Sequence, residues 1–110
     1  MAQSILVERP DGKFEFLKRD GSTATADEQL TVTNAVKSLT AATYGAATRA
    51  FITVEVADIR FRLTGGNPSA TLGHLLKNGE SLVLTSASDI KNFKAFRDAS
   101  ADATIYVTYS

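Results

Sequence analysis

The hydrophobic pattern is clearest at residues 50–63, where apolar and polar positions alternate in two short runs. The first run is apolar at even-numbered positions through Val56, and the second is apolar at odd-numbered positions from Ile59 to Leu63. Because successive side chains of a strand point to opposite faces, each run predicts a strand with one buried face. The phase shift at Ala57–Asp58 predicts a bulge, a bend or a turn between the two strands.

Further short apolar runs predict strands along most of the chain. The alternation at 104–109 predicts a C-terminal strand with one apolar face. Asn78-Gly79 predicts a tight hairpin turn between the apolar run before it and a strand at 81–85. Residues 36–47 are rich in small side chains and fit either an irregular connection or two strands with a turn at Tyr44-Gly45.

One short helix is predicted at residues 88–98. Ile90, Phe93 and Phe96 recur every three residues, which places them on one helical face, and Ser88 is a suitable N-cap. This face fits either a partner-binding stripe or the core of a small domain, and we favour the core. The solvated face of the helix would then carry Lys91, Lys94 and Arg97.

The pattern as a whole predicts a mainly β protein, because short strands recur at about ten-residue spacing with local turns. We expect an antiparallel β-sandwich or a jelly-roll-like barrel with one short helix. Its buried core is expected to contain Ile52, Val54, Ile59, Phe61, Leu82, Leu84, Phe93, Ile105 and Val107.

The N-terminal region differs in character from the rest. Two short apolar runs within residues 3–18 flank the turn sequence Pro10-Asp11-Gly12 and predict a β-hairpin, and the polar stretch 23–28 resembles a linker or extended connection. We therefore divide the chain into an N-terminal arm at 1–28 and a β-sandwich domain at 29–110. An isolated hairpin is marginally stable, so this one is expected to pack on its own domain or on a neighbouring subunit.

Composition narrows the classes of function. The 110 residues include 12 basic and 12 acidic side chains, so the formal net charge is zero, which argues against a nucleic-acid partner. Neutrality also removes one barrier to self-association. There is no cysteine, which excludes disulfides and thiolate metal sites. Neither a signal peptide nor a membrane span is expected, since no long apolar run is present.

Candidate catalytic groups are sparse. His74 is the only histidine, and its neighbourhood lacks the partners of a metal site or a triad, so we interpret it as a surface or satisfied histidine. The glycine-rich stretch 65–69 lacks the Lys-Ser/Thr pair and helix start of a phosphate loop, which indicates turn chemistry. We therefore assign no catalytic, cofactor-binding or metal-binding residues and expect no enzymatic activity, although a small hydrolase using His74 is a further alternative.

Arg60 and Arg62 flank Phe61 on one predicted strand, and such a pattern can bind single-stranded nucleic acid by stacking. Neutralisation by Glu55, Asp58 or Asp102 would instead make it a solvated or subunit-facing surface, which we favour. The candidate protein-interface residues are accordingly Ile5, Val7, Phe14, Phe16, Arg60 and Arg62.

The C-terminal part of the chain resembles a group of small structural proteins of tailed bacteriophages. The resemblance covers about 60 residues and consists of packing and turn residues: IRFRL at 59–63, a G-x-x-P-[ST]-x-T-x-G-H-L-L run at 65–76, NGESLVL at 78–84, an [IL]-x-x-F-[KR]-x-[IF]-R segment at 90–97 and ATIYVTY at 103–109. Residues 1–28 lie outside it.

This resemblance implies a component of the virion, assembled in the bacterial host cytoplasm. A small β domain with an N-terminal arm suits a protein that decorates and cements the capsid, with the major capsid protein and further copies of itself as partners and a homo-oligomeric state. A tail or head–tail connector protein is the alternative within that class. A glycan-binding β-sandwich is an alternative outside it, for which Tyr44, Phe51 and Tyr106 are the candidate aromatic platforms.

Overall fold

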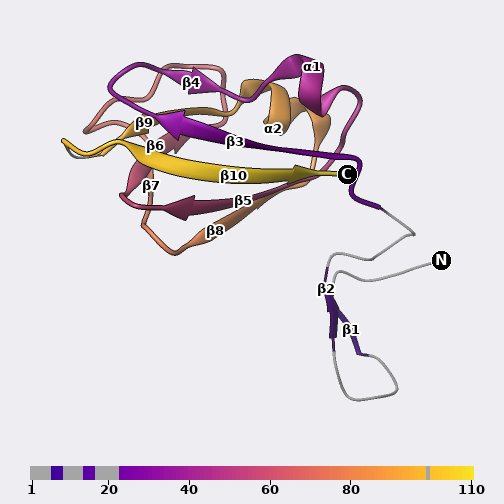
Figure 1. Cartoon of the computed structure of the whole chain (residues 1–110). Helices are drawn as coiled ribbons and strands as arrows, with labels where there is room; N and C mark the ends of the chain where they lie inside the picture. Colours follow the sequence, from indigo (N-terminus) through magenta and orange to yellow (C-terminus); the bar gives the residue numbers. More distant parts are fainter. Residues whose placement is uncertain (1–5, 9–13, 17–22, 99) are drawn as a thin grey trace.

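The computed structural model describes residues 6–8, 14–16, 23–98 and 100–110, with the side chains of 6–8 and 14–16 outside the description (Figure 1). Their elements, in chain order, are β1 (Leu6–Glu8), β2 (Phe14–Phe16), β3 (Ala26–Val32), β4 (Lys37–Ser38), α1 (Ala41–Tyr44), β5 (Ala50–Glu55), β6 (Ile59–Arg62), β7 (His74–Leu76), β8 (Ser81–Leu84), α2 (Ala87–Asn92), β9 (Lys94–Arg97) and β10 (Ala103–Tyr109).

Two four-stranded antiparallel sheets form the body of the protein, which confirms the predicted mainly β sandwich. One sheet has the strand order β3-β10-β5-β8 and the other the order β4-β9-β6-β7. From β3 to β10, consecutive strands lie in opposite sheets except β6 and β7, which pair with each other. Eight strands wound between two sheets in this way make a jelly roll. The prediction of a single helix was wrong, since α1 and α2 are both present.

The phase shift at residues 57–58 marks a crossing between the two sheets. β5 lies in the first sheet and β6 in the second, and both direct their apolar positions into the space between the sheets. The connection includes Val56 with a φ of 79°, a left-handed conformation that a β-branched residue rarely adopts. Because β5 and β6 lie on opposite sides of the core, the shift in phase lets both strands bury their apolar side chains in it.

The turn at Asn78-Gly79 also connects the two sheets, so the predicted hairpin was wrong. β7 pairs with β6, whereas β8 pairs with β5. Gly79 has a φ of 92°, which suits the glycine of a tight turn, and its N–H donates to the carbonyl of Val54 at 2.8 Å. The turn chemistry was correctly read, but the strands that the turn joins belong to different sheets.

The predicted helix at 88–98 is shorter than expected and is followed by a strand. α2 ends at Asn92, and its N-cap is Ser86 rather than Ser88, with Ser86 Oγ accepting from the Asp89 N–H at 3.0 Å. Phe96 lies on β9 and is half-buried, while Ala95 points into the core. The region at 36–47 holds the two-residue strand β4 and the short helix α1, whose C-cap is Gly45.

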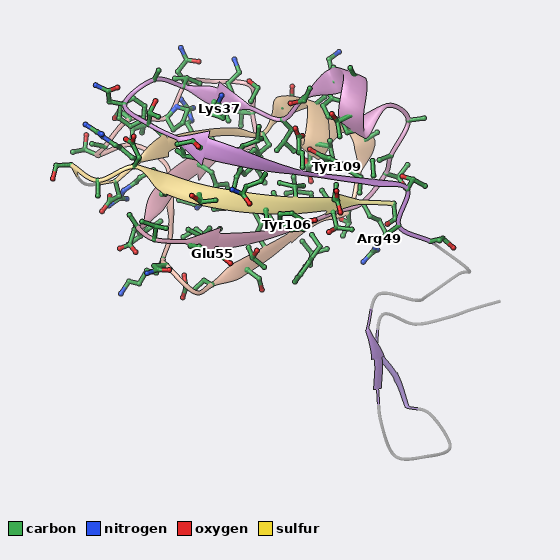
Figure 2. All side chains as sticks on the ribbon, viewed as in Figure 1. Lys37, Arg49, Glu55, Tyr106 and Tyr109 are labelled. Carbon is green, nitrogen blue, oxygen red and sulfur yellow. The ribbon has the colours of Figure 1, made fainter. Side chains whose placement is uncertain are left out.

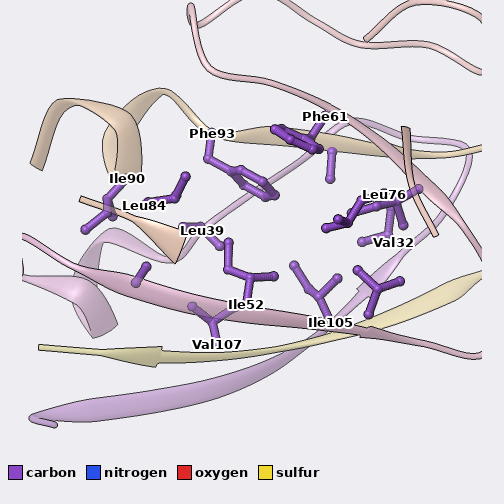
Figure 3. Packing of buried hydrophobic residues seen from close by; sticks show 14 of the residues in the cluster. Val32, Leu39, Ile52, Phe61, Leu76, Leu84, Ile90, Phe93, Ile105 and Val107 are labelled. Carbon is purple, nitrogen blue, oxygen red and sulfur yellow. The ribbon is translucent and has the colours of Figure 1, made fainter. Parts of the chain in front are cut away.

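The core fills the space between the sheets (Figure 3). Eight of the nine residues predicted to be buried are buried, and Leu82 is half-buried against them. Phe93 is fully buried and stacks on Phe61 with ring centroids 5.7 Å apart. Because Phe93 directly follows α2 and Phe61 lies on β6, this ring pair ties the helix to the sheet.

The predicted N-terminal hairpin is present, with β1 paired antiparallel to β2. Figure 1 shows this hairpin apart from the two large sheets. The predicted linker at 23–28 is shorter than expected, because Ala26–Glu28 already belong to β3 and pair with β10.

Candidate functional site

The two sheets differ in the sign of their charged residues. The strands β3, β10, β5 and β8 contain three acidic residues, Asp27, Glu28 and Glu55, and no lysine or arginine. The strands β4, β9, β6 and β7 contain no acidic residue and five basic ones: Lys37, Arg60, Arg62, Lys94 and Arg97. We call these the acidic sheet and the basic sheet. Residues 23–110 carry eight charges of each sign, so the fold separates charges within a neutral domain.

Two of the arginines of the basic sheet are neutralised by the segment between β9 and β10. Arg60 Nε donates to Asp98 Oδ1 at 2.7 Å, and Arg97 Nη1 donates to Asp102 Oδ1 at 2.6 Å. Arg60 Nη1 also donates to the Gly73 carbonyl at 3.2 Å. These contacts fix the position of both guanidinium groups and leave them little net charge to offer a partner.

Arg62 and Lys94 form a second basic pair, which we call the dibasic pair. They are opposite each other across β6 and β9 on the outer face of the basic sheet. Arg62 Nη1 donates to the Asn67 carbonyl at 3.3 Å, and Lys94 Nζ lies 3.5 Å from Asn67 Oδ1. Neither has an ion pair with a carboxylate in the described part of the chain, so both charges remain available to a partner.

The outer face of the acidic sheet is rich in hydroxyl groups. Strands β3, β10 and β5 present Thr31, Thr104, Thr108 and Thr53 alternately with the buried positions. Glu55 and Tyr106 are exposed on the same face (Figure 2), and the exposed Asp27 joins them opposite Thr108. Tyr106 is 41% exposed, and its hydroxyl donates to Asp27 Oδ2 at 2.7 Å. The hydrogen bond to Asp27, followed by desolvation and the charge of Asp27, raises the pKa of Tyr106 above its usual range.

The inner face of the acidic sheet contains a carboxylate bonded to a buried tyrosine. Tyr109 is fully buried, and its hydroxyl donates to Glu28 Oε2 at 2.5 Å. The same oxygen accepts from the Thr40 backbone N–H at 3.1 Å, which connects β3 and β10 to the start of α1. Burial, and then the Glu28 carboxylate, raise the pKa of Tyr109 strongly. This bond is structural, since both groups lie away from the outer face.

A hollow of about 410 Å³ lies at the end of the sandwich next to Ser110. It is lined by Thr25, Ala26, residues 43–48 and Ser110, where the chain enters the sandwich from its N-terminal part. Arg49 follows in sequence, and its Nη2 is buried without a hydrogen-bond partner among the described residues. Arg49 does not line the hollow, so its unpartnered Nη2 assigns no ligand to it.

The site residues expected from the sequence have different outcomes. Arg60 and Arg62 both lie on the outer face of the basic sheet. Neutralisation by Glu55 or Asp58 was wrong: Glu55 is on the acidic sheet, and Asp58 Oδ1 accepts from the Asn78 N–H. Asp102 pairs with Arg97 rather than with Arg60 or Arg62. Ile5 and the side chains of Val7, Phe14 and Phe16 lie outside the described residues.

His74 lies at the start of β7, where its exposed ring contacts Phe61 with centroids 5.3 Å apart. Within the described ranges no group of three or more His, Asp or Glu residues is close enough to hold a metal ion. None of the helices in those ranges is long and apolar enough to cross a lipid bilayer.

The sequence does not reveal that Lys94 lies opposite Arg62, or that Asp27 and Glu55 share one sheet face. The pattern that identifies them is the sign of the charges on each strand, and it becomes visible only after the strands are sorted by sheet. No protein-family model matches this chain, and no curated protein is similar to it.

Proposed function

We propose that this protein is a non-enzymatic structural protein of a tailed-bacteriophage particle, and that it decorates the assembled capsid. The major capsid protein would be its principal partner, and the charged outer faces of the two sheets would be its contact surfaces. The observation that carries the proposal is the separation of charge between the two outer sheet faces of a neutral jelly roll, which suits a protein that contacts two different surfaces at once.

The residues that resemble phage structural proteins support this proposal by their positions. The matched segments include β6, β7 and β9 of the basic sheet, together with β8 and the central strand β10 of the acidic sheet. The structure explains why glycine occupies the matched position 73. Gly73 has a φ of 128°, and a Cβ there would lie 2.9 Å from the Phe61 carbonyl oxygen. The resemblance therefore follows positions that determine this fold, and fold alone does not determine function.

Multiple weak contacts are a suitable binding mode for such a protein. The dibasic pair is half-buried at the protein surface. An ion pair that a partner forms with it there would contribute only about 0–1 kcal/mol. On a symmetric shell, many copies would bind a repeated surface, so contacts that are weak alone would hold through multivalency.

The direct test is the copy number of the chain in purified particles of the phage that encodes it, measured by quantitative mass spectrometry. Hundreds of copies would support a capsid-decorating role. About six or twelve copies would support the tail or connector alternative, because those structures have cyclic symmetry with few subunits. Absence from particles that contain the major capsid protein would overturn the proposal.

The N-terminal hairpin gives a second test. β1 and β2 pair with each other, and we propose that residues 1–22 bind a neighbouring subunit of the particle. Deletion of residues 1–22 should leave a folded domain that melts cooperatively but binds capsids more weakly than the full chain. If the truncated chain loses its cooperative melt, the hairpin belongs to the domain's own core and the proposed role of the arm is wrong.

Tyr106 supports the glycan-binding alternative, because its exposed ring lies beside the Asp27 carboxylate and the exposed Gln29 amide, a common sugar-binding arrangement. A glycan array with the full chain and with Tyr106→Ala tests it. Binding that Tyr106→Ala abolishes would favour this function over capsid decoration, whereas absence of binding on the array would count against it.

A further inference from the structure

Like-charged faces of two copies would repel each other, whereas unlike faces would attract. The outer face of the acidic sheet carries Asp27 and Glu55 and no basic side chain on its strands. The outer face of the basic sheet carries the dibasic pair, which the segment between β9 and β10 leaves without a carboxylate in the described part of the chain. A face-to-face contact between two copies therefore favours one acidic and one basic sheet.

We infer that copies of this chain associate head to tail, with the outer face of the acidic sheet of one copy against the outer face of the basic sheet of the next. This inference rests on the charges of the two sheets and not on the proposed phage particle. Such a contact is heterologous, because it uses two different surfaces. Each associated pair therefore keeps one acidic and one basic face free, so association continues into an open array or closes into a ring rather than stopping at a dimer.

The outer faces also carry side chains suited to a protein contact. Phe96 and Arg60 are opposite each other across β9 and β6, and Leu75 is opposite Arg60 on β7. Leu75 is 39% exposed, and Val36, just before β4, is 38% exposed. On the acidic sheet, Tyr106 and the threonines offer a ring and hydroxyl groups. Each face thus combines charge with apolar area, as the rim and centre of an interface do.

The size of the faces predicts a weak contact. The four strands of the basic sheet are two to four residues long and lie about 4.8 Å apart, so this face covers roughly 200 Å² in projection. This is well below the ~800 Å² that each partner buries in a standard stable interface. Association should therefore be detected at about millimolar concentration. It should weaken as salt rises, because the Debye length shortens from ~30 Å at about 0.01 M to ~3 Å at about 1 M ionic strength.

The absence of cysteine allows a direct test by cross-linking. Ser81→Cys places one thiol on the acidic sheet, and Ser38→Cys places one on the basic sheet; both serines are exposed. The two full-length variants, with tags of different mass, are mixed equally and treated with a short bismaleimide. Random encounters would give roughly half mixed dimers. We expect a clear excess of mixed dimers at low salt, which falls to the random share at high salt.

Neutralisation of the dibasic pair supplies the matched control. Arg62→Gln with Lys94→Gln in both partners should reduce the mixed dimers to the random share. Lys77→Gln with Lys91→Gln also removes two positive charges, but outside the sheets, on the turn after β7 and on α2. This variant should preserve the excess of mixed dimers. Circular dichroism melts verify that all variants are folded.

Each other outcome overturns the inference. An excess of dimers between like faces would show isologous pairing, and a random share at low salt would show that the faces do not pair. If both double variants lose the excess of mixed dimers equally, the effect comes from net charge and not from the dibasic pair. Because only the purified chain is used, any of these results could coexist with a high copy number in particles, so the proposed function is tested separately.

Discussion

The acidic and the basic sheet share one core but have different surfaces. Inside, both contribute apolar side chains of the same kind, such as Ile52 and Val54 from one and Ile59 and Phe61 from the other. Outside, one presents hydroxyl and carboxylate groups and the other arginine and lysine. Packing therefore constrains the inner faces alike, while the outer faces differ in charge without any cost to the core.

The neutralising carboxylates show that the basic sheet is only partly compensated. Asp98 and Asp102 neutralise Arg60 and Arg97, whereas the dibasic pair contacts the neutral side-chain and backbone oxygens of Asn67. Surface ion pairs contribute little to stability, so leaving this pair without carboxylates costs the fold little. The proposed contact between copies rests on this uncompensated half of the sheet.

The largest expected change in stability compares a residue in the core with a residue on the outer face, three positions apart around the start of β9. Phe93→Ala removes a fully buried ring and should lower the free energy of unfolding by about 3–5 kcal/mol. Phe96→Ala, on the outer face, should cost clearly less, because Phe96 is only half-buried. Thermal melts measure both. Equal shifts for the two variants would contradict the assignment of Phe96 to the outer face.

The two tyrosines of β10 test the same contrast within the acidic sheet. Tyr109→Phe removes the donor to Glu28 and should cost about 1 kcal/mol, because the half-buried Glu28 carboxylate loses one hydrogen-bond partner and keeps the Thr40 N–H. Tyr106→Phe, on the exposed face, should change stability little. Urea unfolding at neutral pH measures both changes.

The pH dependence separates the Tyr109 bond from packing. An ordinary tyrosine has a pKa of about 10, and burial and Glu28 raise the pKa of Tyr109. Above pH 10 the unfolded chain therefore loses a proton that the folded chain keeps, so stability falls by ~1.4 kcal/mol per pH unit from this group. Below pH 10 the contribution is constant. The stability of the native chain relative to Tyr109→Phe should decline between about pH 10 and 11, and a constant difference would contradict this assignment.

The crossing between the sheets is the next test. Val56 is 69% exposed and has a φ of 79°, a conformation that asparagine tolerates better than a β-branched residue. Val56→Asn should therefore raise the free energy of unfolding by about 1 kcal/mol. Val56→Thr keeps the branched Cβ and is the matched control, with no gain expected. A loss of stability in Val56→Asn would show that the side chain, rather than the backbone, determines the energetics here.

The smallest effect concerns the two kinds of arginine on β6. Arg60→Gln breaks the contact with Asp98 and should cost about 1 kcal/mol or less, with a smaller cost at high salt. Arg62→Gln should cost less still, because Arg62 contacts only the Asn67 carbonyl. Denaturant titrations at two salt concentrations compare them. A larger, salt-sensitive loss for Arg62→Gln would show that the dibasic pair stabilises the fold.

The sequence by itself determined the strands and the core, because alternation of apolar side chains is a local property that any buried sheet face requires. The main wrong prediction of local structure was the helix at 88–98, whose second half is β9. There the inward position of β9 is Ala95, a small side chain that hides the alternation and leaves three large residues at helical spacing. The other error, the hairpin at Asn78-Gly79, arose because the turn residues define the bend but not the pairing of the strands beside it.

Only the tertiary structure decided which strands share a sheet, and so which charges share a face. β3 pairs with β10 at the opposite end of the chain, and the paired strands of the basic sheet include β4 and β9, which are also far apart in sequence. Along the chain the charges look mixed and neutral, because consecutive strands alternate between the sheets. Folding sorts them by sign, since backbone pairing and the shared core place each strand without regard to its outward side chains.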